Sequence, residues 1–139
     1  MDYVVYISTP FGNKEANPLT TSLRLSRGRL CGGFLYFPRG PSGYLHFTAK
    51  IGVHQILPFN VGQSYRLNGC VIPFHLDIDF FQQPYIIDLV TWNESVSIDH
   101  VLTVGIFLDP YAKPRKTKGI LSTVVEALPG FKTGGDRKI

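Results

Sequence analysis

His75, Asp77 and Asp79 are the residues whose types and spacing could best support chemistry in this chain. Alternate residues of a β-strand point to the same side, so one imidazole and two carboxylates would share one side of a strand. Imidazole nitrogens and carboxylate oxygens both bind divalent cations, and a metal ion could bind here if the strand lined a concavity. The alternative is the exposed side of an ordinary strand, where polar residues at every second position are usual. We favour this alternative and predict no metal and no other cofactor.

Motifs for other kinds of catalysis do not occur in the sequence. There is no Gly-x-Ser-x-Gly, His-Glu-x-x-His or phosphate-loop pattern, and the four histidines are dispersed. We therefore predict that the protein is not an enzyme. Catalysis is the third hypothesis, and it would depend on a metal held by His75, Asp77 and Asp79. The two cysteines, Cys31 and Cys70, each lie in an apolar, strand-like run, so we expect two buried thiols rather than a disulfide.

Charge is unevenly distributed along the 139 residues. Residues 1–109 hold seven Lys/Arg and eight Asp/Glu, whereas residues 110–139 hold seven and two. This division predicts a near-neutral domain followed by a basic extension with different contacts. With 44% hydrophobic and 17% charged residues, the chain should fold as a globular domain. No apolar run approaches the ~20 residues that span a bilayer, and the first residues lack a secretory pattern, so we expect synthesis in a cytosol and no membrane span.

Residues 1–109 have the pattern of short β-strands separated by turns. Apolar residues recur at every second position in several segments, and Gly or Pro punctuates the gaps at intervals of roughly ten residues. The expected strands are 3–9, 19–25, 30–37, 44–50, 53–57, 72–78, 86–92 and 101–108. No helical period of useful length appears before residue 110. This pattern predicts an all-β fold, an antiparallel β-sandwich or barrel, of which we favour the sandwich.

Two turn signals predict hairpins. The strands 19–25 and 30–37 are joined by a Ser-Arg-Gly sequence that permits a tight reversal, so we expect them to pair. Asn68 and Gly69 stand between apolar flanks, and this dipeptide accepts the positive φ values of a type I′ turn. We therefore predict a second hairpin within residues 65–72.

Two further residues indicate which strand positions are exposed. Pro73 cannot donate a hydrogen bond to a neighbouring strand, so its strand should lie at the edge of a sheet or pair irregularly. His46 alternates with the apolar residues Leu45 and Phe47, and this pattern predicts that its side chain faces solvent.

The basic extension divides into a linker and a short amphipathic segment. Proline and cations dominate residues 110–118, which predicts an extended linker. Its cations are Lys113, Arg115, Lys116 and Lys118. Apolar residues then recur at helical spacing, and Pro129 predicts the end of a helix over about 120–128. The apolar side of that helix consists of Ile120, Leu121, Val124, Val125 and Leu128.

A helix of this length is unstable alone and needs a surface that buries its apolar side. That surface could belong to the chain's own sandwich, to a neighbouring subunit or to another protein, or the segment could lack a fixed partner. We favour a neighbouring subunit in a homo- or hetero-oligomer. Clustered cations also gain from contact with phosphate, but Tyr111 is the one aromatic residue among them, so we expect at most weak, non-specific nucleic-acid contact.

The segment 80–85 offers a different binding chemistry. Two phenylalanines, two glutamines, a proline and a tyrosine follow one another there, in an expected loop. Exposed aromatic rings and amide side chains are the groups with which β-sandwich modules bind sugars. The same residues would equally serve ordinary loop packing. A carbohydrate-binding module is therefore the alternative function.

The sequence also resembles a class of viral proteins. The segments LRLSRGRL (23–30) and FLYFPRGPSGYLHF (34–47) share a pattern of glycine-containing turn, apolar strand, Phe-Pro-x-Gly, small-residue turn and apolar strand. Residues 55–59 and 85–92 fit later strands of that pattern. In this pattern the chain resembles small β-sandwich proteins of bacteriophage and related virus particles. The resemblance covers roughly residues 3–109.

The resemblance implies a single jelly-roll-like domain with a structural role. Such a protein would be a capsid, decoration or spike-base component of a virion, assembled in the host cytoplasm and often oligomeric. No catalytic residue is implied. In this interpretation the basic extension holds a neighbouring subunit: its apolar residues fill a groove, and its cations pair with acidic groups at the rim.

Overall fold

Eight antiparallel strands form two four-stranded sheets in the computed structural model, which describes residues 1–115. The predicted all-β, antiparallel architecture is confirmed, and these residues contain no α-helix. The strands are β1 (Asp2–Thr9), β2 (Leu19–Arg24), β3 (Gly28–Phe37), β4 (Leu45–Ile51), β5 (His54–Leu57), β6 (Cys70–Phe80), β7 (Ile86–Asn93) and β8 (His100–Asp109). The expected helix over 120–128 lies outside the described residues. Within residues 1–115 no helix is long and apolar enough to cross a membrane.

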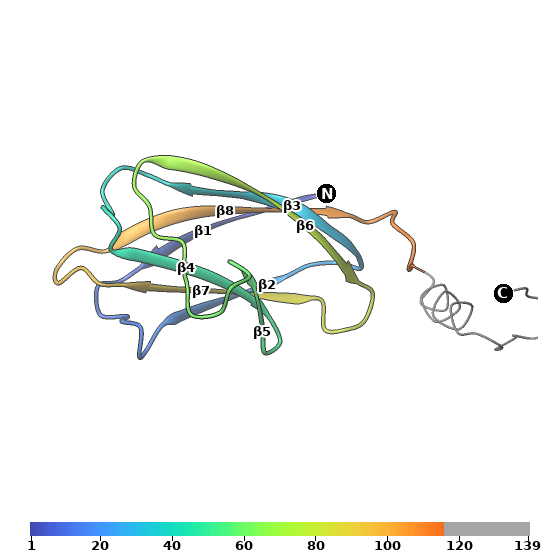
Figure 1. Ribbon diagram of the computed structural model, residues 1–139, viewed down its shortest axis with the longest axis horizontal. Helices are drawn as coiled ribbons and strands as arrows, with labels where there is room; N and C mark the ends of the chain where they lie inside the picture. Colours follow the sequence, from blue (N-terminus) through green and yellow to red (C-terminus); the bar gives the residue numbers. More distant parts are fainter. Residues whose placement is uncertain (116–139) are drawn as a thin grey trace, which may run out of the picture.

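The two sheets face each other as layers (Figure 1). The first sheet has the order β1-β8-β3-β6 and the second the order β2-β7-β4-β5. Only β4 and β5 are consecutive strands that pair with each other, so every other connection passes from one layer to the other. The N-terminus and the end of β8 lie at the same end of the molecule, because β1 and β8 are antiparallel neighbours (Figure 1).

Side chains from both sheets fill the space between the layers. Seventeen buried apolar residues form one cluster, to which all eight strands contribute or against which they pack. The largest fully buried side chains include Phe37 of β3 and Phe47 of β4. Burial of such a side chain stabilises a fold by about 1.5–3 kcal/mol, so this shared core is the principal source of stability. The alternation of apolar and polar residues in β2 places one side of that strand in the core, as the sequence pattern predicts.

Buried polar groups join the layers at the end opposite the N-terminus. The Thr9 hydroxyl donates a hydrogen bond of 2.8 Å to the Thr91 hydroxyl, which links β1 to β7. The fully buried amide of Asn93 donates to the carbonyls of Thr9, at 3.0 Å, and Ile98, at 2.9 Å. Its own Oδ1 accepts from the Ser95 amide at 2.9 Å. These bonds satisfy backbone groups that the turn would otherwise leave unpaired, so Asn93 fixes the loop between β7 and β8.

The central strands β3 and β8 approach closely at two glycines. A Cβ atom on Gly33 would overlap the carbonyl oxygen of Gly105, and one on Gly105 would overlap the ring of Phe34. Phe34 therefore lies over Gly105 on the outer side of the first sheet, with the Phe107 ring 6.2 Å away between centroids. Glycine at these positions allows the backbones of β3 and β8 to approach each other and the Phe34 ring to lie close to the β8 backbone.

Both predicted hairpins are wrong. Residues 65–72 do not pair with one another: Tyr65 forms an isolated bridge with Phe47, and the strand that begins at Cys70 pairs with β3. Asn68 instead accepts hydrogen bonds with its Oδ1 from the amides of Gly40, at 2.8 Å, and Ser42, at 3.0 Å. The Asn-Gly signal thus stabilises a long crossing between the layers, because a side-chain acceptor can fix a turn that is distant in sequence.

The segments expected as the other hairpin lie in different sheets. β2 pairs with β7, and β3 pairs with β6 and β8. The glycine of the Ser-Arg-Gly connection is Gly28, whose added Cβ would meet the backbone of Asp109 in the first sheet, so the turn delivers the chain across the core rather than back along β2. The edge position that Pro73 predicts for its strand is confirmed, since β6 ends the first sheet.

The prediction of two buried thiols is also wrong. Cys31 is exposed at the bulge of β3, and Cys70 is half-buried at the start of β6. Both thiols are free. The register shift between Leu30 and Gly32 turns Cys31 out of the core, which a strict two-residue period would not predict.

The close approach of β3 and β8 can be tested with Gly33→Ala. The added methyl group would collide with a backbone carbonyl, which cannot move aside as a flexible side chain can, so we expect a loss of about 1–3 kcal/mol in the free energy of unfolding. Gly12→Ala is the matched control, because nothing lies within 4 Å of its added Cβ. Urea unfolding of both variants measures the difference. Equal midpoints would show that the strands do not approach as described.

Candidate functional site

The first six residues of the extension are fixed to the outside of the first sheet. After β8 ends at Asp109, the Asp109 carboxylate accepts a hydrogen bond from the Tyr111 amide at 3.0 Å. Arg29 of β3 then donates from its Nη2 to the carbonyl of Lys113 at 2.9 Å. The guanidinium of Arg115 pairs with Asp77 and Asp79 of β6, with 3.5 Å from its Nε to Asp79 Oδ1. The chain thus passes from β8 over β3 to the edge strand β6.

Asp77 and Asp79 are held by arginines. Arg29 donates from its Nε to Asp79 Oδ1 at 2.8 Å, so Asp79 bridges two guanidinium groups. The hydrogen bond from Arg115 lowers the pKa of Asp77 below its ordinary value, because it stabilises the carboxylate. The same bond raises the pKa of Arg115. This pairing makes the start of the extension a defined attachment point, although each exposed ion pair contributes little by itself.

This attachment bears on the weak candidate for a metal site, which we expected to bind no metal. His75, Asp77 and Asp79 do share the exposed side of β6, as their spacing predicts. In the described part of the chain, however, no three His, Cys, Asp or Glu side chains are grouped so that they could hold a metal ion. The two carboxylates face cations of this chain instead, so metal binding at these residues finds no support.

Of the residues predicted to bind a partner, the structure describes Lys113 and Arg115. Lys113 contributes its carbonyl to the attachment, and the carboxylate partners of Arg115 belong to this chain. The others lie outside the described residues: Lys116, Lys118, Ile120, Leu121, Val124, Val125 and Leu128. Their contact with a neighbouring subunit stays a prediction.

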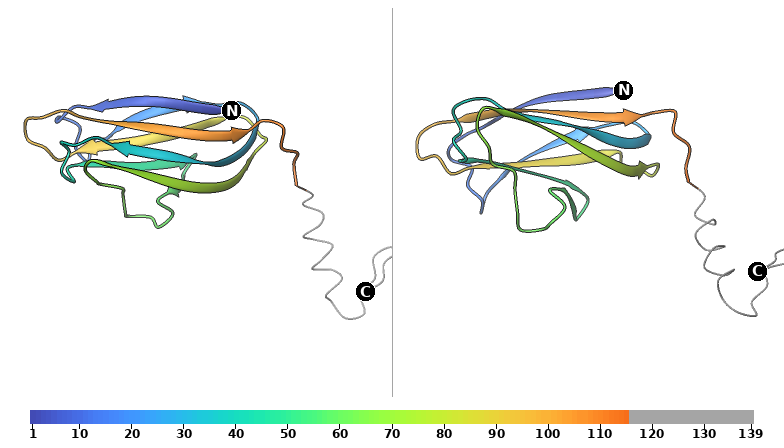
Figure 2. Two further views of the ribbon diagram at one scale, coloured as in Figure 1. Left: turned by 90° about the horizontal axis from the view of Figure 1, so that it is seen from above. Right: turned by 45° about the horizontal axis from the view of Figure 1, so that its top comes forward.

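The outer side of the first sheet carries an apolar surface, which we call the outer face. It consists of Val4 and Tyr6 of β1, Phe107 of β8, Phe34 and Tyr36 of β3, and Val71 and Pro73 of β6. The exposed fractions are 69% for Tyr6, 63% for Val4 and 58% for Val71. Figure 2, left, views this sheet from above, and no described segment covers it. The sequence-based predictions above did not include this surface.

A signal for the outer face was nevertheless present. In the middle of β1 the outward residues Val4 and Tyr6 alternate with the inward residues Val5 and Ile7, so this part of the strand is apolar on both sides. A strand with water on one side normally carries polar residues there. The two apolar residues on the exposed side of β1 are therefore the sequence signal for the outer face.

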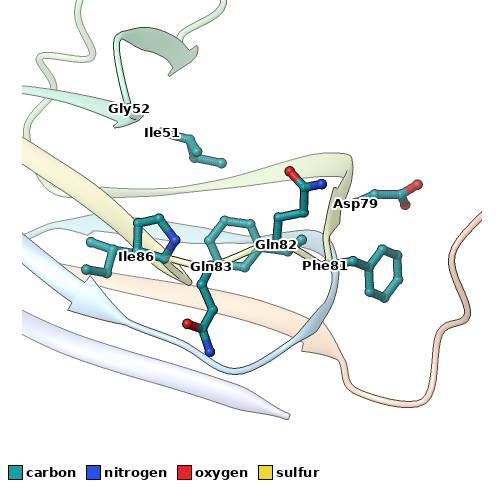
Figure 3. Close-up of a pocket in the computed structure, with 9 residues that line it drawn as sticks. Ile51, Gly52, Asp79, Phe81, Gln82, Gln83 and Ile86 are labelled. Atoms are coloured by element: carbon teal, nitrogen blue, oxygen red, sulfur yellow. The ribbon is translucent and has the colours of Figure 1, made fainter.

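The predicted sugar-binding loop lines a depression of about 440 Å³ between β6 and β7. The amides of Gln82 and Gln83 point in opposite directions from it (Figure 3). The Arg27 guanidinium lies 4.8 Å from the centroid of the Phe81 ring, and Phe80 is buried. A sugar needs a free ring face and converging polar groups. Here Arg27 lies against the Phe81 ring and the two glutamine amides diverge, so the loop gives little support to carbohydrate binding.

His46 is buried, so the prediction that it faces solvent is wrong. Its ring stacks on Trp92 of β7, with 4.9 Å between centroids. Its Nδ1 lies 2.6 Å from the Ser64 hydroxyl, and its Nε2 lies 2.7 Å from a carboxylate oxygen of Glu94. The connection between β5 and β6 runs along β4 through the Tyr65–Phe47 bridge and brings Ser64 against His46. A long loop from a distant part of the chain therefore excludes solvent from a position that its strand alone would expose.

No protein-family model, curated protein or solved structure matches this chain.

The burial of His46 predicts how stability depends on pH. Desolvation lowers the pKa of His46 below its ordinary 6.5, an effect that Arg66 reinforces and Glu94 opposes. The unfolded chain then binds a proton more readily than the folded one, so stability is greatest above pH 6.5 and falls as the pH drops through that value toward the folded-state pKa. Burial lowers the pKa of His100 in the same direction.

We expect the urea midpoint of the wild-type protein to fall between about pH 7.5 and about pH 5.5, and the fall to be smaller in His46→Gln. The exposed His54 provides the control, because His54→Gln should keep the wild-type pH dependence. If the urea midpoint of His46→Gln fell as much as that of the wild-type protein, the His46 imidazole would not be the cause of the pH dependence.

Proposed function

We propose that this protein is a non-enzymatic structural component of a virus particle, a single jelly roll whose C-terminal extension holds a neighbouring subunit. The strand orders β1-β8-β3-β6 and β2-β7-β4-β5, with crossings between the layers at all connections except β4–β5, fit an eight-stranded jelly roll. That fold serves capsid proteins, and also lectins and cupins, so it supports the proposal without deciding it. The protein would be a capsid, decoration or spike-base component, assembled in the host cytoplasm.

The observation that carries the proposal is the attachment of the extension to the body. Arg29 and Arg115 hold residues 110–115 against β6, so the remaining basic and apolar segment starts from one defined place on the surface. A segment that starts from a fixed point engages a nearby subunit at high effective concentration. Lys116 and Lys118 would then pair with acidic groups of that subunit, and the apolar residues of 120–128 would fill a groove on it.

The extension can be tested in the full chain by placing charge on its apolar side. Leu121→Glu with Val125→Glu should lower the mass of the assembly measured by light scattering, because two carboxylates cannot enter an apolar groove without a large desolvation cost. The matched control is Ser122→Glu with Thr123→Glu, which adds the same charge away from that side. The control should assemble like the wild-type protein.

Both variants should keep the wild-type urea midpoint, since the changes lie beyond residues 1–109. If the Leu121→Glu, Val125→Glu protein assembles as fully as the wild-type protein, the extension does not hold a neighbour. A wild-type chain with only the monomer mass of 15.6 kDa at every concentration and salt tested would argue against self-assembly altogether.

A further inference from the structure

We infer that the outer face is the interface between two copies of this chain, packed sheet to sheet. The inference rests on the proposed structural function and names the first partner as a second copy. It concerns the described body of the protein and does not depend on the extension.

The outer face is a continuous surface rather than a set of scattered residues. Tyr6 and Tyr36 both lie opposite Thr103, and Tyr36 also lies opposite Val71, so one row crosses all four strands. The adjacent row contains Val4, Gly105, Phe34 and Pro73 in the same order. Five of the fifteen large apolar side chains that are exposed in the described residues lie on this one side. A contiguous apolar surface of this kind marks a contact with another molecule.

The relief of the outer face suits a second sheet. Phe34 lies close against Gly105, where a larger residue would displace the ring, and the ring of the neighbouring Phe107 is tilted by 50° relative to it. Side chains from two sheets can interdigitate when both surfaces are low, and packed sheets lie about 10 Å apart.

Charge favours an identical partner. The two central rows contain no ionisable group other than the Tyr6 and Tyr36 hydroxyls, and the charged residues of this side stand at the end near the extension. There Arg29 and Arg115 pair with Asp77 and Asp79. In a two-fold interface each surface meets itself, so an uncharged centre avoids the repulsion of like charges. A nucleic acid would require cations in the centre, and none is present there.

The whole outer side of the first sheet, of which the outer face is the central part, is large enough for a dimer. Four strands at about 4.8 Å spacing and eight residues at about 3.3 Å rise give this whole side roughly 500 Å² per copy. Two copies that meet over the whole side would bury roughly 1,000 Å², which is the lower limit for a specific interface. A dimer of moderate affinity is expected, and further contacts through the extension would add avidity.

The test is the concentration dependence of mass for full-length Tyr6→Glu and full-length Val71→Glu. These residues stand at opposite edges of the outer face and are 69% and 58% exposed, so neither change should disturb the fold. Each substitution occurs twice in a two-fold interface. Each should therefore raise the dissociation constant of the dimer by at least about tenfold. Val53→Glu and Val96→Glu are the controls, because these valines are 88% and 86% exposed and lie elsewhere.

The outcomes separate this inference from the proposed role of the extension. In the Leu121→Glu, Val125→Glu background the dimer should persist, and adding Tyr6→Glu should give monomers. If the Tyr6→Glu and Val71→Glu variants dimerise as strongly as the chain without the substitution, the outer face is not the interface. This conclusion holds whether or not the extension binds a neighbour. If all four single variants weaken association equally, the effect is one of added charge and the inference fails.

Discussion

The shared core between the two sheets is the constraint on which the rest of this structure depends. Each sheet buries its inner side only against the other, and all connections except the one between β4 and β5 cross from one layer to the other. Neither layer can therefore form from local hairpins alone. The last strand, β8, lies between β1 and β3, so the sheet that carries the extension is complete only when both ends of the domain have met.

The same constraint brings the surface features together. Arg29 and Asp79 are fifty residues apart in the sequence, yet their adjacent strands place Arg29 Nε 2.8 Å from Asp79 Oδ1. Both side chains also contact the start of the extension. The outer face likewise combines residues from the first, third, sixth and eighth strands. Core packing thus fixes the inner side of the first sheet, while its outer side remains free to carry residues selected for contact.

Two contacts of different kinds would suit a subunit of a particle. An apolar face supplies a contact of defined geometry, whereas an attached extension reaches a neighbour whose position can vary. Each contact could be weak alone, and together they would hold a subunit firmly in place. The buried cluster around His46 would add a dependence of fold stability on pH, and it forms part of neither contact.

The sequence by itself determined the strands, the all-β class and the edge position of β6, because the two-residue period, Gly and Pro act locally. It also determined the common side of His75, Asp77 and Asp79. Tertiary structure alone decided which strands pair, why Asn68 fixes a crossing rather than a hairpin, and how a distant loop buries His46. It also decided that arginines hold the two carboxylates and that Val4 and Val71 share one surface. These relations join residues far apart in the chain, and local patterns carry no information about them.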